Sequence, residues 1–287
     1  LNAIAANHEN IVVGWENALV NRRLDWLDQY LQGLYLFYDF RSRYHDGAAL
    51  LGRTLKQLEG DAQAAPLHGR MLARLGIMQS RLSQNDTAIV TLTAALHQLA
   101  DTDQPDEQAI CMVWLANLIR KRKSQAEAGE LAREALEISR KIDYQPGIAR
   151  ALYMLGVSQN AQGDWQSAAK LFGESVQMAR KLQNPRLLMS PLNMLADTAC
   201  SKGDFEQATQ LYTECQEIAR RLGDQYNLAM QYNNLGTVHH YQGDYAAAIN
   251  LYEESLAICT KIGDRDGQAI ALSNLGEAAA ASGNALQ

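Results

Sequence analysis

Three series of residues recur at every fortieth position along this sequence, and they keep one common register. The first is a Gly-Asp-aromatic triplet at 163–165, 203–205 and 243–245. The second is a leucine followed by a small residue: Leu75-Gly76, Leu115-Ala116, Leu155-Gly156, Leu195-Ala196, Leu235-Gly236 and Leu275-Gly276. The third is an alanine that follows each of the first five leucines at a constant distance, at positions 88, 128, 168, 208 and 248. A fixed period of this length indicates stacked copies of one supersecondary unit.

Each unit has the pattern of two helices joined by a tight turn. Ile148, Leu152 and Leu155 share one helical face, and a second face at the same 3/4 spacing includes Ala168 and Phe172. Between the two faces, Gly163 suits the left-handed position that ends a helix, and Asp164 suits the N-cap of the next. Ser83-Gln84 and Lys123-Ser124 replace this turn in two units, which we therefore expect to be less regular. No strand alternation competes with the helical pattern.

The large-small-aromatic pattern resembles the tetratricopeptide repeat (TPR), with Leu155-Gly156, Ala168 and Phe172 carrying the match in one unit. The shortest form of that repeat has ~34 residues. The longer step from Gly163 to Gly203 and on to Gly243 is closer to the longer-helix variety of kinesin light chains and maltose-activator-type regulators. The resemblance covers roughly residues 42–287. It implies an all-α fold, a right-handed superhelix (α-solenoid) of antiparallel helix pairs.

The repeat register also predicts the domain organisation. We expect an additional N-terminal helix in 1–22, followed by a solenoid over 23–287. A lone helix at 267–281 should close the array, with the turn position at Gly283-Asn284. The expected helix pairs occupy approximately residues 23–59, 67–100, 107–141, 147–182, 187–222 and 227–262.

The string His8-Glu9-Asn10-Ile11, followed by Trp15, Ala18 and Leu19, resembles the segment that opens the repeat region of STAND-class NTPases and related transcription regulators. In those proteins a nucleotide-binding portion precedes it. We therefore expect this chain to be one piece of a longer protein.

Composition restricts the partners. The chain has 26 Lys and Arg against 32 Asp and Glu, a net charge of −6, which argues against direct nucleic-acid binding. No apolar run approaches the ~20 residues of a membrane helix. The four cysteines form no CxxC pair, which favours a reducing, cytoplasmic location.

Motifs of catalysis and cofactor binding are absent from the sequence. There is no phosphate loop, no HExxH, no GxSxG and no GxGxxG, so we expect neither an enzyme nor a cofactor. His239 and His240 point about 100° apart on a helix and suit a metal ion poorly. A hydrolase or metal enzyme that uses Asp197, His240 and Glu277 is the remaining catalytic alternative. The basic run at 120–123 indicates either a helix end or a patch for an anionic partner.

The concave surface of a solenoid is its usual binding surface. The resemblance implies that the first helix of each unit lines this surface. We call the leucines of the second repeat series the anchor leucines, and positions −2, +2 and +5 from each of them the slots. The side chains in these slots share one side of the first helix. The candidate binding residues in these slots are Asn117, Arg120, Tyr153, Asn160, Asn193, Asp197, Asn233, Thr237 and His240. Asparagine amides both donate and accept, so Asn193 and Asn233 are similar to the ladder with which such proteins grip a peptide backbone. The alternative is that these polar groups only face water.

Two functions follow as hypotheses. The first is a non-catalytic ligand- or protein-binding sensor of a larger STAND-type NTPase or transcription regulator, whose groove binds a protein, a peptide or other domains of the parent chain. The second is a free-standing scaffold or adaptor for extended peptides. Neither requires nucleic acid or membrane as a direct partner.

Overall fold

The computed structural model describes residues 8–41, 43–100, 102–122 and 124–285. Over these residues the protein forms fourteen α-helices and one short 3-10 helix, with no strand, so the all-α prediction is confirmed. Contacts divide the chain into two compact units, Leu1–Gln162 and Gly163–Gln287. The prediction of one solenoid over 23–287 stays a prediction.

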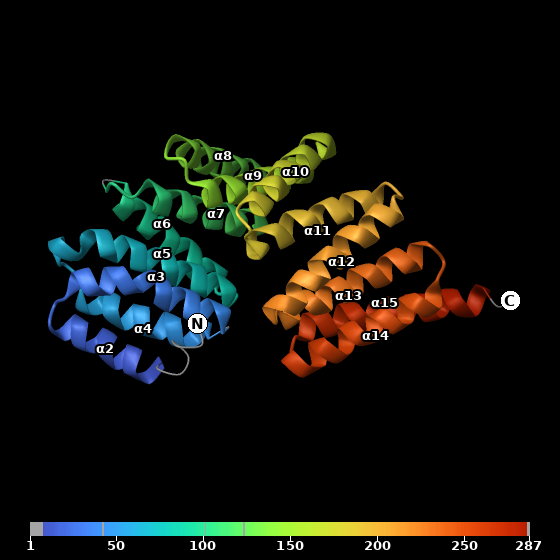
Figure 1. Ribbon diagram of the computed structural model, residues 1–287, viewed down its shortest axis with the longest axis horizontal. Helices are drawn as coiled ribbons and strands as arrows, with labels where there is room; N and C mark the ends of the chain where they lie inside the picture. The colour runs from blue at the N-terminus through green and yellow to red at the C-terminus, as the bar shows by residue number, and fades with distance from the viewer. Residues whose placement is uncertain (1–7, 42, 101, 123, 286–287) are drawn as a thin grey trace. The chain divides into compact units, whose positions relative to one another are not determined.

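Consecutive helices pack against one another within each unit, joined by short turns (Figure 1). The helices of the first unit are α2 (His8–Val20), α3 (Leu24–Phe40), α4 (Tyr44–Gln57), α5 (Ala65–Arg81), α6 (Asn85–Leu99), α7 (Pro105–Lys121), α8 (Gln125–Lys141) and α9 (Gln145–Ala161), with the 3-10 helix at Ala62–Ala64. Those of the second unit are α10 (Trp165–Lys181), α11 (Pro185–Ser201), α12 (Phe205–Leu222), α13 (Gln225–Tyr241), α14 (Tyr245–Ile262) and α15 (Arg265–Ala285).

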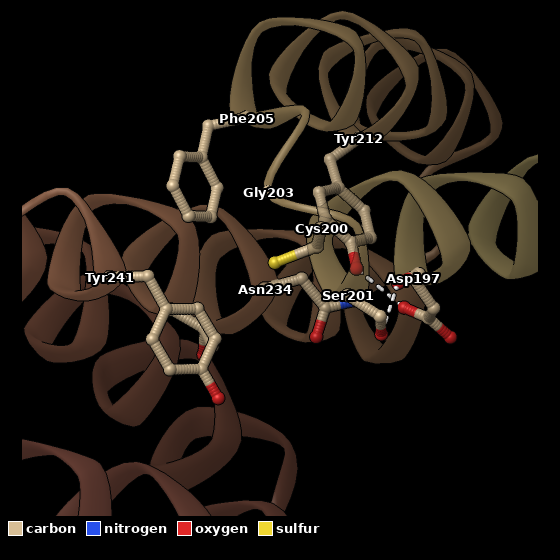
Figure 2. Close-up of a pocket in the computed structure, with 9 residues that line it drawn as sticks. Asp197, Cys200, Ser201, Gly203, Phe205, Tyr212, Asn234 and Tyr241 are labelled. Carbon is tan, nitrogen blue, oxygen red and sulfur yellow. Dashed lines mark hydrogen bonds between the residues drawn. The ribbon is translucent and has the colours of Figure 1, made fainter.

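The turns between paired helices have the geometry that the Gly-Asp pattern predicts. Gly163 has φ +86°, and the Asp164 side chain accepts a hydrogen bond from the Ser167 backbone N–H at 3.0 Å. Gly203 repeats this arrangement with φ +77°, in the loop between α11 and α12 that Figure 2 labels. A glycine adopts this left-handed conformation without steric cost, so the turn sets where each second helix begins.

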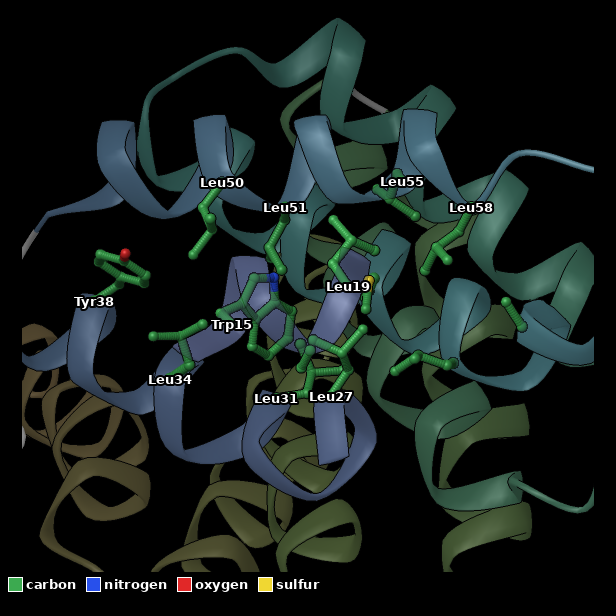
Figure 3. Close-up of a cluster of buried hydrophobic side chains, with 14 of the residues drawn as sticks. Trp15, Leu19, Leu27, Leu31, Leu34, Tyr38, Leu50, Leu51, Leu55 and Leu58 are labelled. Carbon is green, nitrogen blue, oxygen red and sulfur yellow. The ribbon is translucent and has the colours of Figure 1, made fainter. Parts of the chain in front are cut away.

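The additional N-terminal helix is packed into the first unit rather than standing apart from it. Trp15 on α2 is fully buried and its indole N–H donates a hydrogen bond to the Thr54 hydroxyl on α4 at 3.0 Å. Leu27 and Leu31 on α3 are buried in the same cluster, which Figure 3 shows around the indole ring. Burying a side chain of this size stabilises a fold by about 2–3 kcal/mol, so α2 is an integral part of this unit.

The last described helix differs from the sequence expectation. We expect a helix that ends near Ala280–281 with a turn at Gly283-Asn284, but α15 continues to Ala285. Glycine in a helix costs only about 1 kcal/mol relative to alanine and does not break it. No second helix follows Gly283 within the described residues, so no packing pulls the backbone into a turn there.

The core of the second unit holds α11, α12 and α13 together. Ala196 on α11, Ala208 and Tyr212 on α12, and Leu235 and Val238 on α13 are buried in one cluster. Because alanines occupy the contact positions of two neighbouring helices, their backbones approach closely. This packing fixes the first helices α11 and α13 around the cavity described next.

Candidate binding site

A cavity of about 570 Å³ opens between α11, the start of α12 and α13 in the second unit. Its size falls within the range of small-ligand pockets. The lining residues come from α11, the turn that follows it, α12 and α13, and Figure 2 draws them as sticks. They are Asp197, Cys200, Ser201, Gly203, Phe205, Tyr212, Asn234, Thr237 and Tyr241.

A carboxylate braced by a buried tyrosine lies at one end of the cavity. The Tyr212 hydroxyl donates a hydrogen bond to Oδ1 of Asp197 at 2.5 Å (Figure 2). Tyr212 is only 4% exposed, so its ring is fixed by the core and the hydroxyl position is fixed with it. Asp197 itself is open to solvent, and no lysine or arginine of the described residues forms an ion pair with it. The carboxylate is thus held in place without an internal cation.

The surroundings of this carboxylate shift its protonation. Desolvation by the neighbouring protein raises the pKa of Asp197, and the Tyr212 hydrogen bond opposes part of that rise. Burial and the negative charge of Asp197 raise the pKa of the Tyr212 phenol, which keeps it a donor. Burial also raises the pKa of the Cys200 thiol, so Cys200 is not an activated nucleophile.

Two aromatic rings form the other side of the cavity. The rings of Phe205 and Tyr241 lie nearly parallel, with an interplanar angle of 24° and centroids 6.4 Å apart. Figure 2 shows both rings on the side away from Asp197. Tyr241 is 64% exposed, so much of its side chain is open to a ligand. The cavity therefore presents an aromatic face and an anionic end.

The polar groups between these two ends of the cavity differ in their hydrogen-bond partners. The Thr237 hydroxyl donates to the Asn233 carbonyl at 3.1 Å and accepts from the Tyr252 hydroxyl at 3.3 Å. The Ser201 hydroxyl donates to the Asp197 backbone carbonyl at 2.8 Å. The Asn234 amide makes no hydrogen bond to any of the described residues. Asn234 is therefore available to a ligand as both donor and acceptor.

Only some of the predicted slots of the second unit line the cavity. Asp197 and Thr237, both at the +2 slot of their anchor leucines, line the cavity, whereas Asn193 and Asn233, at the −2 slot, do not. Oδ1 of Asn233 accepts a hydrogen bond from Asn274 on α15 at 2.8 Å. Oδ1 of Asn193 is inaccessible to solvent and has no hydrogen-bond partner. The cavity follows positions −1, +2 and +6 of α13, which lie about 40–100° around the helix from −2.

The remaining predicted residues lie elsewhere. His240 is outside the cavity, with its ring edge-on to Tyr245 at a centroid distance of 5.4 Å. Asn117 and Arg120 are half-buried on α7 and joined by a hydrogen bond of 3.2 Å. Tyr153 and Asn160 are half-buried on α9. These last four belong to the first unit, so the structure does not bring them together with Asp197.

Sequence reasoning did not single out five of the lining side chains as binding residues: Ser201, Phe205, Tyr212, Asn234 and Tyr241. One signal was present for Tyr212, which has the same register as Phe172 and Tyr252, the aromatic residues of the repeat pattern. Asn234 stands next to the −2 slot. The alternative of a catalytic trio is not assembled, since His240 and Glu277 do not line the cavity with Asp197.

Neither a metal cluster nor a membrane helix is found in the part of the chain that the structure describes. No group of three or more His, Cys, Asp or Glu residues is placed there to hold an ion. None of the described helices combines the length and apolar character needed to span a bilayer. The basic run is partly neutralised, since Arg122 forms an ion pair with Asp86.

Similarity to solved structures extends over most of the chain. A STAND protein with a tetratricopeptide repeat sensor from Pyrococcus horikoshii matches with a TM-score of 0.70 at 15% identity, covering 89% of this chain and 38% of that one. A Rap protein complexed with Competence and Sporulation Factor matches with a TM-score of 0.63 at 14% identity, covering 85% and 72%. BtubC from P. vanneervenii matches with a TM-score of 0.60 at 17% identity, covering 77% and 92%. At these identities the likeness is one of fold.

No curated protein sequence matches this chain. The family model of the tetratricopeptide repeat matches residues 107–181, 187–261 and 227–286, together more than half of the chain. Repeats of this kind indicate a protein-binding domain, and their fold is generally a non-catalytic interaction scaffold. The chain belongs to the tetratricopeptide repeat family.

Proposed function

We propose that this chain is a non-catalytic recognition domain that holds a protein or peptide segment against the first helices of its repeats. The cavity of the second unit is the observation that supports this most directly. Its Asp197 carboxylate has no internal cation, and its Asn234 amide makes no hydrogen bond within the described residues. Fully buried polar groups are normally bonded within the protein, whereas Asp197 is exposed and Asn234 is half-buried. Groups that line a cavity and stay unbonded suit an external ligand.

We further propose that the domain is the sensor part of a larger STAND-type NTPase or transcription regulator. The fold likeness to the P. horikoshii STAND protein, which has a tetratricopeptide repeat sensor, supports this context. The segment that resembles the opening of such repeat regions forms α2 and is anchored by the buried Trp15. A bound segment would bias the states of an attached switch through its different affinity for each state.

The cytoplasm is the location that we propose, because all four cysteines are free thiols and suit a reducing compartment. Neither nucleic acid nor a membrane is proposed as a direct partner, since the net charge is −6. Other domains of a parent chain are the intramolecular alternative to a separate partner.

Two experiments test the proposal, one for peptide recognition and one for the sensor role. Selection of random peptides on the immobilised 287-residue chain should enrich a common sequence pattern, and selection without enrichment would contradict recognition. Sequencing of the gene upstream of Leu1 should reveal a phosphate loop within the same reading frame. Its absence would contradict the sensor role and leave recognition in place.

A free-standing peptide adaptor is the second candidate, and one observation favours it. The fold is similar to a Rap protein that was crystallised with Competence and Sporulation Factor. If the Asn193/Asn233 ladder grips a peptide, Asn193→Ala combined with Asn233→Ala should weaken peptide binding sharply. Asn274→Ala is the matched control, because it frees Oδ1 of Asn233 without removing a ladder residue. Unchanged affinity in the double variant would contradict the ladder.

A further inference from the structure

We infer that the cavity of the second unit binds an arginine side chain of an extended peptide, with the guanidinium between the Asp197 carboxylate and the rings of Phe205 and Tyr241. This inference rests on the proposed recognition function and names the chemistry of its ligand. It is carried by three independent features of the cavity: its unpaired anion, its aromatic wall and its free amide.

The anionic end selects a cation. Asp197 is held at 2.5 Å by the buried Tyr212 hydroxyl, which occupies only one of its oxygens. A carboxylate has about four lone-pair sites, so Oδ2 and part of Oδ1 remain free to accept. Because the carboxylate is fixed before the ligand arrives, little side-chain entropy is lost when a cation binds.

The aromatic wall distinguishes among cations. A planar guanidinium stacks on an aromatic face and also donates to a carboxylate in the same plane, whereas an ammonium is a compact, strongly hydrated charge. The rings of Phe205 and Tyr241 lie nearly parallel to each other, on the side of the cavity away from Asp197 (Figure 2). The arrangement therefore fits arginine better than lysine.

The remaining polar group indicates a peptide rather than a free amino acid. The Asn234 amide has no partner among the described residues and lines the same cavity. An amide donates and accepts at once, which matches the backbone C=O and N–H of one peptide unit. A cavity of about 570 Å³ also has room for more than one side chain.

The raised pKa of Asp197 agrees with this geometry. Desolvation by the surrounding protein acts against the charged form of the carboxylate. A bound arginine would supply a positive charge and favour ionisation.

The test compares peptide selection on three forms of the whole chain: the unmodified protein, Asp197→Asn and Glu253→Gln. Glu253 is an exposed carboxylate on α14 that does not line the cavity, so Glu253→Gln removes the same unit charge elsewhere. We expect arginine at one fixed position in the selected peptides on the unmodified protein and on Glu253→Gln. On Asp197→Asn this enrichment should disappear.

Fluorescence anisotropy with the best selected peptide completes the test. Changing its arginine to glutamine, or Tyr241→Leu in the protein, should each weaken binding by about tenfold or more. Changing arginine to lysine should cost less than changing it to glutamine. Free arginine at millimolar concentration should not displace the peptide.

Three results would overturn the inference. Selected peptides without a fixed arginine, bound equally by Asp197→Asn, would show that recognition exists but does not use this chemistry. Displacement by free arginine alone would assign the cavity to a small molecule. Failure to select any peptide would contradict the proposed function as well as the inference.

Discussion

The Tyr212 hydroxyl and the Asp197 carboxylate are joined by a hydrogen bond of 2.5 Å, and the same link recurs one repeat later between Tyr252 and Thr237 at 3.3 Å. Both pairs are separated by 15 residues, so a tyrosine on the second helix braces the +2 position of the first. One repeat earlier the same register holds Val157 and Phe172, which have no side-chain hydroxyl and no acceptor. The brace therefore occurs in the two repeats that combine a tyrosine at this register with a polar +2 side chain.

Removing the Tyr212 hydroxyl should change how Asp197 titrates. Desolvation raises the pKa of Asp197 and the Tyr212 hydrogen bond lowers it, so Tyr212→Phe should raise that pKa further. A carbon-detected NMR titration of the Asp197 carboxyl group measures the change. Tyr252→Phe is the control, since its hydroxyl bonds the neutral Thr237. An unchanged or lowered Asp197 pKa in Tyr212→Phe would contradict the assignment.

Neutralising Asp197 should stabilise the folded chain at neutral pH. Because the folded-state pKa of Asp197 lies above its unfolded value, ionisation favours the unfolded state as pH rises through that interval. Asp197→Asn cannot ionise, and its amide oxygen can still accept from Tyr212. We expect a higher urea midpoint for the variant at pH 7 and no difference at about pH 3, below the ordinary aspartate pKa. A midpoint lowered at pH 7 would contradict this reasoning.

Local sequence signals predicted the helices and turns well, because their causes are local. Glycine at φ +77° and an aspartate N-cap act within a few residues, and Gly203-Asp204 shows both. Where Ser83 replaces that glycine, the backbone still adopts φ +59°, so the packing of α5 against α6 imposes the turn. Repeat register therefore outweighed a single unfavourable residue.

The site was harder to predict because it depends on contacts between helices. Two residues before the anchor leucine of α13 stands Asn233, which bonds Asn274 on α15. One residue before that leucine stands Asn234, which lines the cavity. One residue along a helix is a rotation of about 100°. Periodicity identifies the buried face, but it does not fix which flanking position a neighbouring helix will cover. Tyr212 was missed for the same reason, since its hydroxyl reaches Asp197 on another helix.

A glycine that follows an anchor leucine should matter for stability only where a second helix covers it. A Cβ at Gly236 would lie 2.7 Å from a ring carbon of Tyr252, whereas a Cβ at Gly276 on α15 would meet nothing within 4 Å. Gly236→Ala should therefore destabilise the protein by about 1–3 kcal/mol through overpacking. Gly276→Ala should stabilise it by up to about 1 kcal/mol through helix propensity. Urea unfolding measures both, and equal effects of one sign would contradict the packing.

The stability of the folded chain should depend on both members of a buried ion pair in the first unit. Nη1 and Nη2 of Arg74 on α5 donate to Oε2 and Oε1 of Glu107 on α7, both at 2.7 Å, and Nε donates to Gln32 on α3. Both charged side chains are only 5% exposed, so Glu107→Gln leaves a buried guanidinium without its counter-charge. Such a loss costs about 3–5 kcal/mol. The double variant Arg74→Met with Glu107→Met should recover most of it, because both buried charges are removed and Arg70, which also bonds Glu107, keeps its ion pair with Asp28.

The control for this pair is Glu130→Gln, which breaks the exposed pair of Glu130 and Arg133 on α8. Water and salt screen an exposed pair, so that variant should cost less than about 1 kcal/mol. Urea unfolding of the four proteins at one pH ranks the effects directly. If Glu107→Gln cost no more than Glu130→Gln, or if the double variant were the least stable, the contacts among α3, α5 and α7 would not depend on this buried pair. We expect the opposite order, since the guanidinium of Arg74 has no water to replace the carboxylate that it loses.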